Sequence, residues 1–412
     1  MDTNCFMPDD VSSLPRGPGF KESIALLALM ISFVALSLDI MLPALPYIGR
    51  DLGVKHPNDV QLVVSVLVFG LALGQLAYGP VSDSIGRKPA IYAGILIFVV
   101  GCLLSILSTR FEVMLAARFM QGIGAAGPRS VIVALIRDQY GGRAMARMMS
   151  AVMAVFIFVP AMAPTFGQAI LLVADWRAIF TALLVLGLVA FVWFAVRQPE
   201  TLPKERRTSF CARNILTSAI EVCTNRIALG YTLAAGLVLG ILIGYLSCAQ
   251  QIFQEVYDLG RRFPLYMAVL ALFIGGASYC NSRIVLRAGM RSLSWLAIRL
   301  LIAVSVVYLV LVYLMGGHSP LWLLMVCFAV DFFCLGILFG NLNAIAMEPL
   351  AHIAGVGAAV VSSLSNLVAV VIGTLIGQSY NGTTLPLVGG FAVLSITAAV
   401  AMRWADHKRA LG

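Results

Sequence analysis

The chain has 412 residues, of which 60% are hydrophobic and only 11% are charged, and its formal net charge is +9. Soluble domains are about 45–50% apolar and about 25% charged, so this composition excludes a soluble globular protein and indicates an integral membrane protein. The eight cysteines form no Cys-x-x-Cys pair, so no disulfide framework, metal site or other cofactor is predicted. The positive charge gathers in short loops beside apolar runs, which indicates attraction to anionic lipid and no binding of nucleic acid.

Apolar runs long enough to cross a bilayer recur along the chain. A transmembrane helix needs about 20 predominantly apolar residues, and in lipid a helix satisfies its own backbone groups. By this length criterion, the sequence predicts an all-α integral membrane protein with twelve spans. The predicted spans are residues 24–46, 60–82, 89–108, 113–136, 148–172, 177–196, 225–249, 263–286, 293–315, 320–343, 355–378 and 385–404.

One loop is longer than the others, is strongly basic, and divides the spans into two sets of six. Six helices on each side of such a linker are typical of a transporter with two bundles and a site between them near the bilayer midplane. The predicted domains are an N-terminal arm (1–23), an N-terminal six-helix bundle (24–196), a linker (197–224), a C-terminal six-helix bundle (225–404) and a tail (405–412).

Basic residues are distributed unevenly between the two sides of the predicted bundle. Of the 28 Lys and Arg residues, nineteen fall on the side of the termini and the linker, and three fall within spans. Because cytoplasmic loops carry the excess of basic residues, both termini are predicted to be cytoplasmic. The six basic residues on the opposite side are Arg50, Lys55, Arg110, Arg177, Arg261 and Arg262.

The first span contains an acid, Asp39, followed four residues later by Pro43. A charged group near the bilayer centre costs on the order of 2.5–3.5 kcal/mol on insertion scales, so such residues are usually functional and face the protein interior. Burial favours the neutral form of an acid, which suits a group that takes up and releases a proton. Pro43 lacks an N–H, so the helix is expected to bend beside Asp39. The alternative is a structural acid neutralised by an Arg of a neighbouring helix.

A charged turn joins the second and third spans. Its glycines, Gly79 and Gly86, permit a tight backbone fold, and Arg87 and Lys88 are typical of a cytoplasmic loop. Asp83 contributes little to topology, so we expect it to have a partner such as a helix N-terminus or an Arg. The turn is therefore a functional candidate.

The fourth span carries two arginines, Arg118 and Arg129. Arg keeps its charge inside proteins, so both must face protein or water. They are eleven residues apart, which at 100° per residue returns to within about 20° of the same direction, so both are predicted to face the same interior. Arg118 is a functional candidate, whereas Arg129 either contributes to a site or pairs structurally.

The fifth span contains Pro160, Pro164 and Gly167. This pattern kinks a helix and, in the sharper interpretation, makes it a hinge that flexes against a neighbour. Tyr245, within the seventh span, either lines a cavity for substrate or packs in the core.

The tenth span contains a second intramembrane acid, Asp331. The nearest obvious counter-charge is Arg299 of the ninth span. The two residues either form a structural lock, or Asp331 is a second proton or substrate site, and the sequence favours neither reading.

These motifs together resemble the major facilitator superfamily and, within it, the twelve-helix drug:proton antiporters of the bicyclomycin-resistance and chloramphenicol-exporter type. The turn from Gly79 to Pro89 is similar to the superfamily loop G-x-L-x-D-R-x-G-R-K-P, with Val81 and Ser84 as departures. The usual helix-five motif G-P-x-x-G-G is not intact. Further similarities lie in the first helix (38–46), in the fourth helix (118–126) and around the sixth helix (175–180 and 199–202).

The resemblance implies a major facilitator fold with defined residue roles. Asp39 would be the proton-linked acid and Arg118 a coupling residue, while Asp83, Gly86 and Arg87 would belong to the conformational gate. The implied function is multidrug efflux, in which a monomer exports small amphipathic drugs or toxicants across the bacterial inner membrane in exchange for protons. The sequence has no G-x-x-x-x-G-K-[ST] phosphate loop, which favours the proton gradient as the energy source.

Two alternatives to export stay open. An uptake symporter for a small metabolite would use the same fold and the same acid. A membrane-embedded enzyme or a non-transporting sensor is an alternative of another class. Against the enzyme, the sequence has no His-Glu-x-x-His motif, and its four histidines fall in loops or at span ends.

Overall fold

The computed structural model describes residues 18–208 and 212–407, and these residues are almost entirely helical. Residues 1–17 of the predicted arm and residues 408–412 of the predicted tail lie outside the described part, as do Cys5 and Cys211. The other six cysteines are free thiols.

The first half of the chain forms six long helices, the first of which is interrupted. A three-ten turn, η1 (Leu42–Ala44), separates α1 from the short α2, and η2 (Pro57–Gln61) precedes α3. The helices are α1 (Phe20–Asp39), α2 (Leu45–Asp51), α3 (Leu62–Ile85), α4 (Arg87–Leu107), α5 (Phe111–Gln139), α6 (Gly142–Leu171) and α7 (Arg177–Arg197).

The second half repeats six long helices. The helices are α9 (Arg226–Gln251), α10 (Phe263–Ala288), α11 (Met290–Leu314), α12 (Leu321–Met347), α13 (Ala354–Gln378) and α14 (Leu385–Asp406). Between the halves lie a three-ten turn, η3 (Lys204–Arg206), and α8 (Ala212–Thr224). Short turns also follow α9, precede α10 and separate α12 from α13; they are η4 (Ile252–Val256), η5 (Gly260–Arg262) and η6 (Glu348–Ile353).

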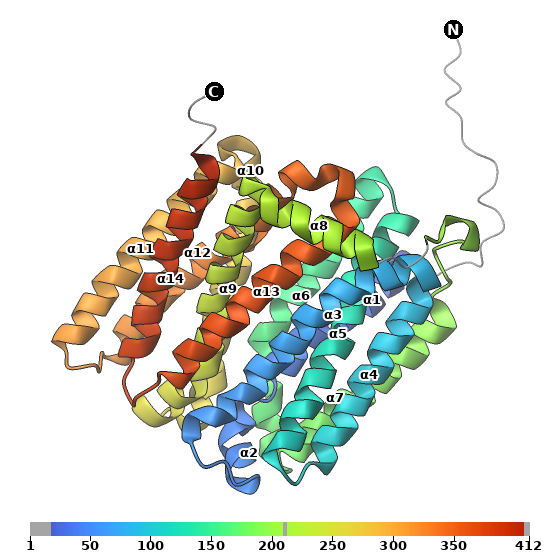
Figure 1. Ribbon diagram of the computed structural model, residues 1–412. Coiled ribbons are helices and arrows are strands. Elements are labelled where there is room, and N and C mark those ends of the chain that lie inside the picture. Colours follow the sequence, from blue (N-terminus) through green and yellow to red (C-terminus); the bar gives the residue numbers. More distant parts are fainter. Residues whose placement is uncertain (1–17, 209–211, 408–412) are drawn as a thin grey trace.

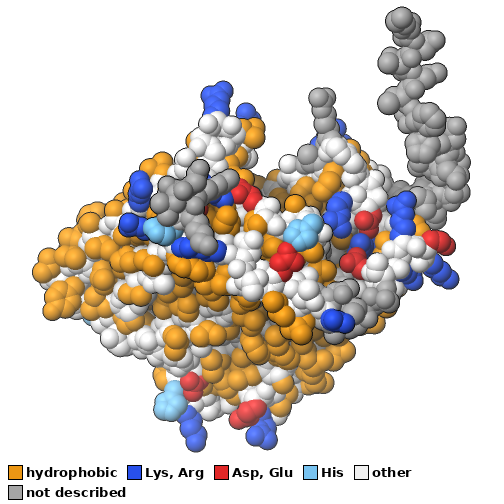
Figure 2. Space-filling view, turned by 45° about the horizontal axis from the view of Figure 1, so that its top comes forward, with side chains coloured by type: hydrophobic (Ala, Val, Ile, Leu, Met, Phe, Trp, Pro, Cys, Tyr) orange, Lys and Arg blue, Asp and Glu red, His pale blue; other side chains and the backbone are white. Residues whose placement is uncertain are grey.

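The long helices have the length and composition of membrane spans. Within the described residues, eleven apolar segments are long enough to cross a membrane, and the longest, Leu321–Gln378, contains both α12 and α13. Figure 2 shows charged side chains at the two ends of one face and apolar side chains over the band between them. The predicted fold class, an all-α membrane protein with twelve spans in two six-helix bundles, is confirmed.

Both described ends of the chain lie at the same end of the molecule (Figure 1). We call this end, where α1 begins and α14 ends, the terminal side, and the opposite end, with α2 and η2, the far side. The linker crosses the terminal side, and its helix α8 packs against α13 and α9. This helix was not predicted from the sequence, and at 13 residues it is too short to span a bilayer.

The turn between the second and third spans is shorter than the sequence analysis predicted. Helix α3 continues through Gly79 and Asp83 to Ile85, and α4 begins at Arg87. The reversal is made by Gly86 alone, whose φ of 109° lies in the region that residues with a Cβ avoid. Gly79 is therefore not a turn residue; it lies within α3, where a Cβ would have ordinary contact with Ala359 of α13 at 3.7 Å.

Helix α5 lies at the centre of the first half because its glycines let two neighbours approach closely. A Cβ on Gly122 would lie 2.0 Å from the carbonyl oxygen of Leu67 in α3, and one on Gly124 would lie 2.4 Å from the amide nitrogen of Phe98 in α4. Small residues at such contacts bring helix backbones together in membranes. This packing holds Arg118 of α5 against α1 and α3.

Candidate functional site

A cavity of about 450 Å³ lies between the two halves of the chain. Its lining comes from α1, α3, α5 and α6 on one side and from α9, α10, α12 and α13 on the other. Most lining side chains are aliphatic or aromatic, and the charged ones are Asp39 and Arg129. An apolar pocket with a few convergent polar groups is typical of a small-molecule site.

Asp39 lines this cavity at the point where α1 is interrupted. The helix ends at Asp39, and Pro43 stands within the three-ten turn that follows, where the missing N–H of proline breaks the helical hydrogen-bond pattern. The side chain is 5% exposed and forms no ion pair with any described residue. In this state, therefore, Asp39 is not neutralised by an Arg, as the structural alternative would require.

Helix α6 packs closely against the interruption in α1. A Cβ on Gly167 would lie only 1.8 Å from the carbonyl oxygen of Ile40, so the α6 backbone touches the residue that follows Asp39. On the same helix, Pro160 lines the cavity and Pro164 stands one turn farther along. The predicted helix-five residues thus lie between the cavity and the break beside the acid.

Arg118 is fully enclosed within the first half of the chain. Its Nη2 donates to the carbonyl oxygen of Ser37 at 2.6 Å, and its Nε donates to that of Val63 at 3.1 Å. Its Nη1 donates to Oε1 of Gln121 at 2.5 Å, and its guanidinium lies 5.7 Å from the ring centre of Phe180. These acceptors are all neutral, so Arg118 holds α1 by its backbone, two residues before Asp39, and no described carboxylate pairs with it.

The two arginines of α5 do not face the same space, contrary to the sequence prediction. Arg129 lines the central cavity with its guanidinium 5.9 Å from the ring centre of Phe156, whereas Arg118 does not reach the cavity. They share a helix face but lie about 16 Å apart along the axis. Because of this difference in depth, Arg118 contacts α1 and α3, whereas Arg129 lines the space between the halves.

Three aromatic side chains of the second half line the cavity: Tyr245, Phe332 and Phe339. Tyr245 of α9 stands edge-on to Phe332 at 4.8 Å and to Phe328 at 6.0 Å between ring centres. Its hydroxyl is buried and has no hydrogen-bond partner within the described residues. Buried polar groups normally have a partner, so this hydroxyl is available to a bound molecule. Tyr245 therefore packs in an aromatic cluster and also lines the cavity.

Asp331 is buried inside the second half, and among the described residues it forms no ion pair with Arg299, so the structural lock is not formed in this state. Its Oδ2 accepts a hydrogen bond from Ser305 at 3.4 Å, and its Oδ1 has no partner among the described residues. Arg299 is exposed instead and stacks on Trp295, because it lies close to the terminal side of α11, whereas Asp331 lies in the middle of α12.

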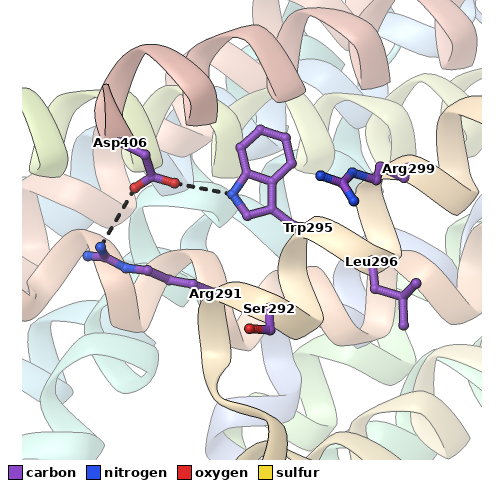
Figure 3. Close-up of a pocket in the computed structure, with 6 residues that line it drawn as sticks. All are labelled: Arg291, Ser292, Trp295, Leu296, Arg299 and Asp406. Carbon is purple, nitrogen blue, oxygen red and sulfur yellow. Dashed lines mark hydrogen bonds and ion pairs between the residues drawn. The ribbon is translucent and has the colours of Figure 1, made fainter. Parts of the chain in front are cut away.

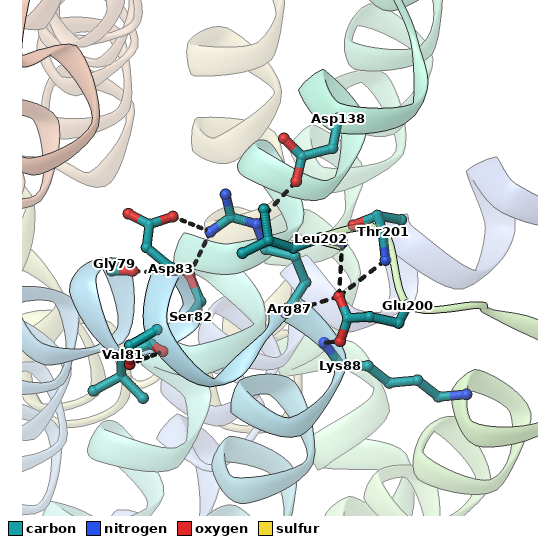
Figure 4. A network of polar contacts seen from close by, with 11 residues as sticks. Gly79, Val81, Ser82, Asp83, Arg87, Lys88, Asp138, Glu200, Thr201 and Leu202 are labelled. Atoms are coloured by element: carbon teal, nitrogen blue, oxygen red, sulfur yellow. Dashed lines mark hydrogen bonds and ion pairs between the residues drawn. The ribbon is translucent and has the colours of Figure 1, made fainter. Parts of the chain in front are cut away.

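The residues around Gly86 form a polar network at the terminal side (Figure 4). Arg87 donates from Nη1 to Asp83 at 2.5 Å and from Nε to Asp138 of α5 at 2.9 Å. Lys88 donates from Nζ to the carbonyl oxygen of Ala195 near the end of α7 at 2.8 Å. The network lies within the first half of the chain. Asp83 therefore pairs in this state with Arg87, and an Arg is one of the two kinds of partner that the sequence suggested.

Glu200 of the linker completes this network, although it was not predicted from the sequence as a site residue. Its Oε1 accepts from the backbone N–H of Arg87 at 3.0 Å and its Oε2 from that of Lys88 at 3.0 Å, so the carboxylate caps the N-terminus of α4. The same Oε1 accepts from the N–H groups of Thr201 and Leu202 at 2.9 Å each. The available signal was the Pro-Glu-Thr-Leu sequence directly after the sixth span.

The family model described as "Major Facilitator Superfamily" matches residues 27–374, most of the chain. The chain belongs to the major facilitator superfamily. It is 30% identical over 392 residues to the uncharacterized MFS-type transporter YdgK of Bacillus subtilis, with 93% of this chain and 95% of the relative covered. It is 28% identical over 392 residues to the bicyclomycin resistance protein homolog of Haemophilus influenzae, with 92% and 94% covered. These matches confirm the resemblance seen in the motifs.

A solved structure of this superfamily has the same fold. The xylose transporter XylE of Escherichia coli, in a partially occluded inward open conformation, matches with a TM-score of 0.71 at 11% identity. The match covers 93% of this chain and 97% of XylE. At this identity the likeness concerns the fold alone.

Amide side chains join the two halves of this facilitator at the far side. Asn58 donates from Nδ2 to the carbonyl oxygens of Gln378 at 3.1 Å and Tyr380 at 2.9 Å, and Gln378 donates back to the carbonyl oxygen of Asn58 at 3.0 Å. Gln251 donates to Oδ1 of Asn58 at 3.1 Å and accepts from Gln61. Each half supplies both donors and acceptors, so the far side is closed by uncharged groups. We call these five residues the far-side seal.

Replacing Glu200 should loosen the terminal-side network of this facilitator. Glu200→Ala removes the cap from α4, and the loss of a capping side chain costs about 0.5–2 kcal/mol of stability. We expect a lower unfolding temperature of the purified protein in detergent, with Glu200→Gln intermediate because it keeps an acceptor. Glu205→Gln, in the exposed η3 turn, is the matched control. Equal unfolding temperatures for Glu200→Ala and the control would contradict the capping role.

Proposed function

We propose that the protein exports small amphipathic drugs or toxicants from the bacterial cytoplasm in exchange for protons. The observation that carries the proposal is Asp39, a buried acid without an ion-pair partner in the described structure, in the wall of a largely apolar cavity between the two halves. A resistance protein is among the relatives, which supports efflux. The cavity is contained within one chain, so the proposed transport unit is a monomer.

In the proposed cycle, one acid serves two ligands in turn. When the cavity opens to the outside, Asp39 takes up a proton; when it opens to the cytoplasm, the proton leaves as substrate binds. Arg118 acts as the coupling residue because it holds α1 at Ser37 and places a positive charge near the acid. The positive charge favours the ionised form of Asp39 whenever α1 moves toward it.

The described state is closed at the far side by the seal and corresponds in the proposal to the inward-facing half of the cycle. The excess of Lys and Arg places the terminal side in the cytoplasm. Asp83, Gly86, Arg87, Lys88 and Gly79 are the proposed gating elements, since their network lies where the terminal side would have to close. In the other half of the cycle we expect Asp83 to leave Arg87 and contact the second half of the chain.

Reconstituted protein tests the exchange directly. In proteoliposomes with an internal pH indicator and no imposed gradient, adding a transported drug to one side should drive proton movement in the opposite direction. Proton movement in the same direction as the compound would identify the uptake symporter instead. Absence of substrate-dependent proton movement across a broad compound panel would favour the sensor or enzyme alternatives.

We propose Asp331 as a second proton site. Asp331→Asn should lower the number of protons moved per drug molecule while the amount of protein in the membrane stays near the wild-type level. The hydrogen bond that Asp331 accepts from Ser305 is long, at 3.4 Å, and Asn retains an acceptor. The measurement is the ratio of proton flux to drug flux in proteoliposomes. Reduced protein with an unchanged ratio would identify Asp331 as a purely structural residue.

Weakening the far-side seal should shift the resting population toward the outward-facing state. Gln251→Leu removes the donor to Oδ1 of Asn58 and the acceptor of the Gln61 amide, and a polar group that loses its buried partner costs about 1–3 kcal/mol. We expect a cysteine at position 246, in the cavity wall, to react faster with a membrane-impermeant maleimide added from the far side. Gln254→Leu is the control, because among the described residues the side chain of Gln254 bonds to Gln250 of its own half and to no residue of the other half. An unchanged rate in Gln251→Leu would contradict the role of the seal.

A further inference from the structure

A second cavity, of about 510 Å³, opens near the terminal side of α11 (Figure 3). It shares no lining residue with the central cavity. Five of its lining residues recur along one stretch of α11, and the sixth is the last residue of α14. The lining residues are Arg291, Ser292, Trp295, Leu296, Arg299 and Asp406.

Two of the charges in this cavity compensate each other. Asp406 lies 3.7 Å from Nη1 of Arg291 and accepts hydrogen bonds from the indole N–H of Trp295 at 3.1 Å and the hydroxyl of Tyr231 at 2.9 Å. Arg291 also pairs with Glu348 at 2.7 Å. Asp406 is therefore fully engaged, and its bond to Trp295 fixes the orientation of the indole ring.

Arg299 is left without an acid. It forms no ion pair in the part of the chain that the structure describes, and its guanidinium lies 5.6 Å from the ring centre of Trp295. Figure 3 shows the indole between the carboxylate of Asp406 and the guanidinium of Arg299. The neighbouring Leu296 and Leu300 are 68% and 45% exposed, so this face of a membrane-spanning helix is turned toward lipid. An unpaired charge on such a face is costly unless an anion from the surroundings compensates it.

The reach of the Arg299 side chain brings its charge toward the headgroup layer, where the compensating anion would lie. Helix α11 has 25 residues and is about 37 Å long, so it exceeds a hydrocarbon core of about 30 Å and its ends enter the headgroup layer. Arg299 lies about 13 Å from the start of the helix. Side chains of a helix lean toward its N-terminus, and long basic side chains extend toward the interface, so the guanidinium rises toward Trp295 and the headgroups.

We propose that this cavity binds the phosphate of an anionic phospholipid. The guanidinium of Arg299 pairs with the phosphate, the hydroxyl of Ser292 is a second donor two helical turns nearer the interface, and the exposed leucines contact the acyl chains. Trp295 anchors the site at the membrane interface, where indole rings are favoured. We assign the phosphate to a lipid because Arg299 lies beside the exposed Leu296 and Leu300 on the lipid-facing side of α11, where a free ion does not partition.

Native mass spectrometry of the full-length protein tests the site by titration with phosphatidylglycerol, phosphatidylcholine or inorganic phosphate. We expect the wild type to retain phosphatidylglycerol in preference to phosphatidylcholine, and Arg299→Gln to weaken phosphatidylglycerol binding about fivefold. Arg299→Met, whose apolar chain suits a lipid-facing surface, should show the same loss. The matched control is Arg283→Gln, because Arg283 also stacks on an aromatic ring four residues earlier, Tyr279, but lines neither cavity.

The outcomes distinguish a specific lipid site from general surface charge and from a site for a free anion. Unchanged phosphatidylglycerol binding in both Arg299 variants overturns the proposal, as does an equal loss in Arg283→Gln, which would indicate general surface charge. Displacement of the lipid by inorganic phosphate at similar concentrations would identify a free-anion site and overturn the lipid assignment. A loss confined to the Arg299 variants, with inorganic phosphate ineffective, supports it.

Discussion

Asp39→Asn should abolish drug-driven proton movement without removing the protein from the membrane. The replacement keeps the size of the side chain and imitates the neutral acid, so the contacts around the break in α1 persist while no proton can be released. We expect drug resistance in a pump-deficient host to fall to the level of cells without the transporter. In proteoliposomes, exchange of labelled for unlabelled drug should continue, because that exchange needs no proton to leave Asp39.

Two variants control for this result. Asp39→Glu restores an acid at the same position and should recover part of the coupled transport. Asp175→Asn removes an exposed acid from the loop before α7 and should leave transport unchanged, since Asp175 lies far from the cavity lining. Resistance equal to wild type in Asp39→Asn, at equal membrane levels, would remove Asp39 from the mechanism and with it the proposed antiport.

Gly167→Ala should disable the transporter through packing, with the acid itself intact. A Cβ at this position would lie 1.8 Å from the carbonyl oxygen of Ile40, and both groups belong to backbones that cannot move aside as a flexible side chain does. Overpacking of this kind typically costs about 1–3 kcal/mol and displaces the elements involved. We expect α6 to be pushed away from the break in α1, with a lower unfolding temperature and greatly reduced transport.

The control for Gly167→Ala is Gly276→Ala on α10, where no atom lies within 4 Å of the added Cβ. This second variant should keep both stability and transport, because alanine favours a helix over glycine and meets no obstacle. Measurement of unfolding temperature beside transport rate distinguishes the two effects. Wild-type stability and transport in Gly167→Ala would show that α6 does not depend on its close approach to Ile40.

The two predictions test different properties of the site: the exchangeable proton of Asp39 and the packing of α6 against α1. Asp39→Asn leaves the contact between α6 and α1 in place but removes the exchangeable proton. Gly167→Ala leaves the proton site in place but alters the helix that adjoins it. The proposed mechanism requires both, because a proton on Asp39 matters for transport only if the break in α1 and the neighbouring α6 change together.

Much of the membrane architecture was predictable from the residues alone. Length and hydropathy decide how many helices cross a bilayer, since about 20 apolar residues are needed whatever the neighbours are. The interruption of α1 beside Asp39 was also predictable, because Pro43 acts on its own backbone. The reversal at Gly86 was predicted only approximately: a helix boundary depends on a single backbone angle, and the charged residues that suggested a longer turn are compatible with helix.

The pairing of side chains was decided by the tertiary structure. Arg118 and Arg129 share a helix face, yet one binds the backbone of α1 and the other lines the cavity, because each meets different helices at its own depth. The partner of Asp83 is Arg87, Arg299 is left at the lipid-facing surface, and Asp331 has no cation beside it in the described structure. Local sequence determines which segments cross the membrane; the contacts of a charged group depend on how helices distant in sequence are rotated and staggered, and only the folded arrangement sets those two quantities.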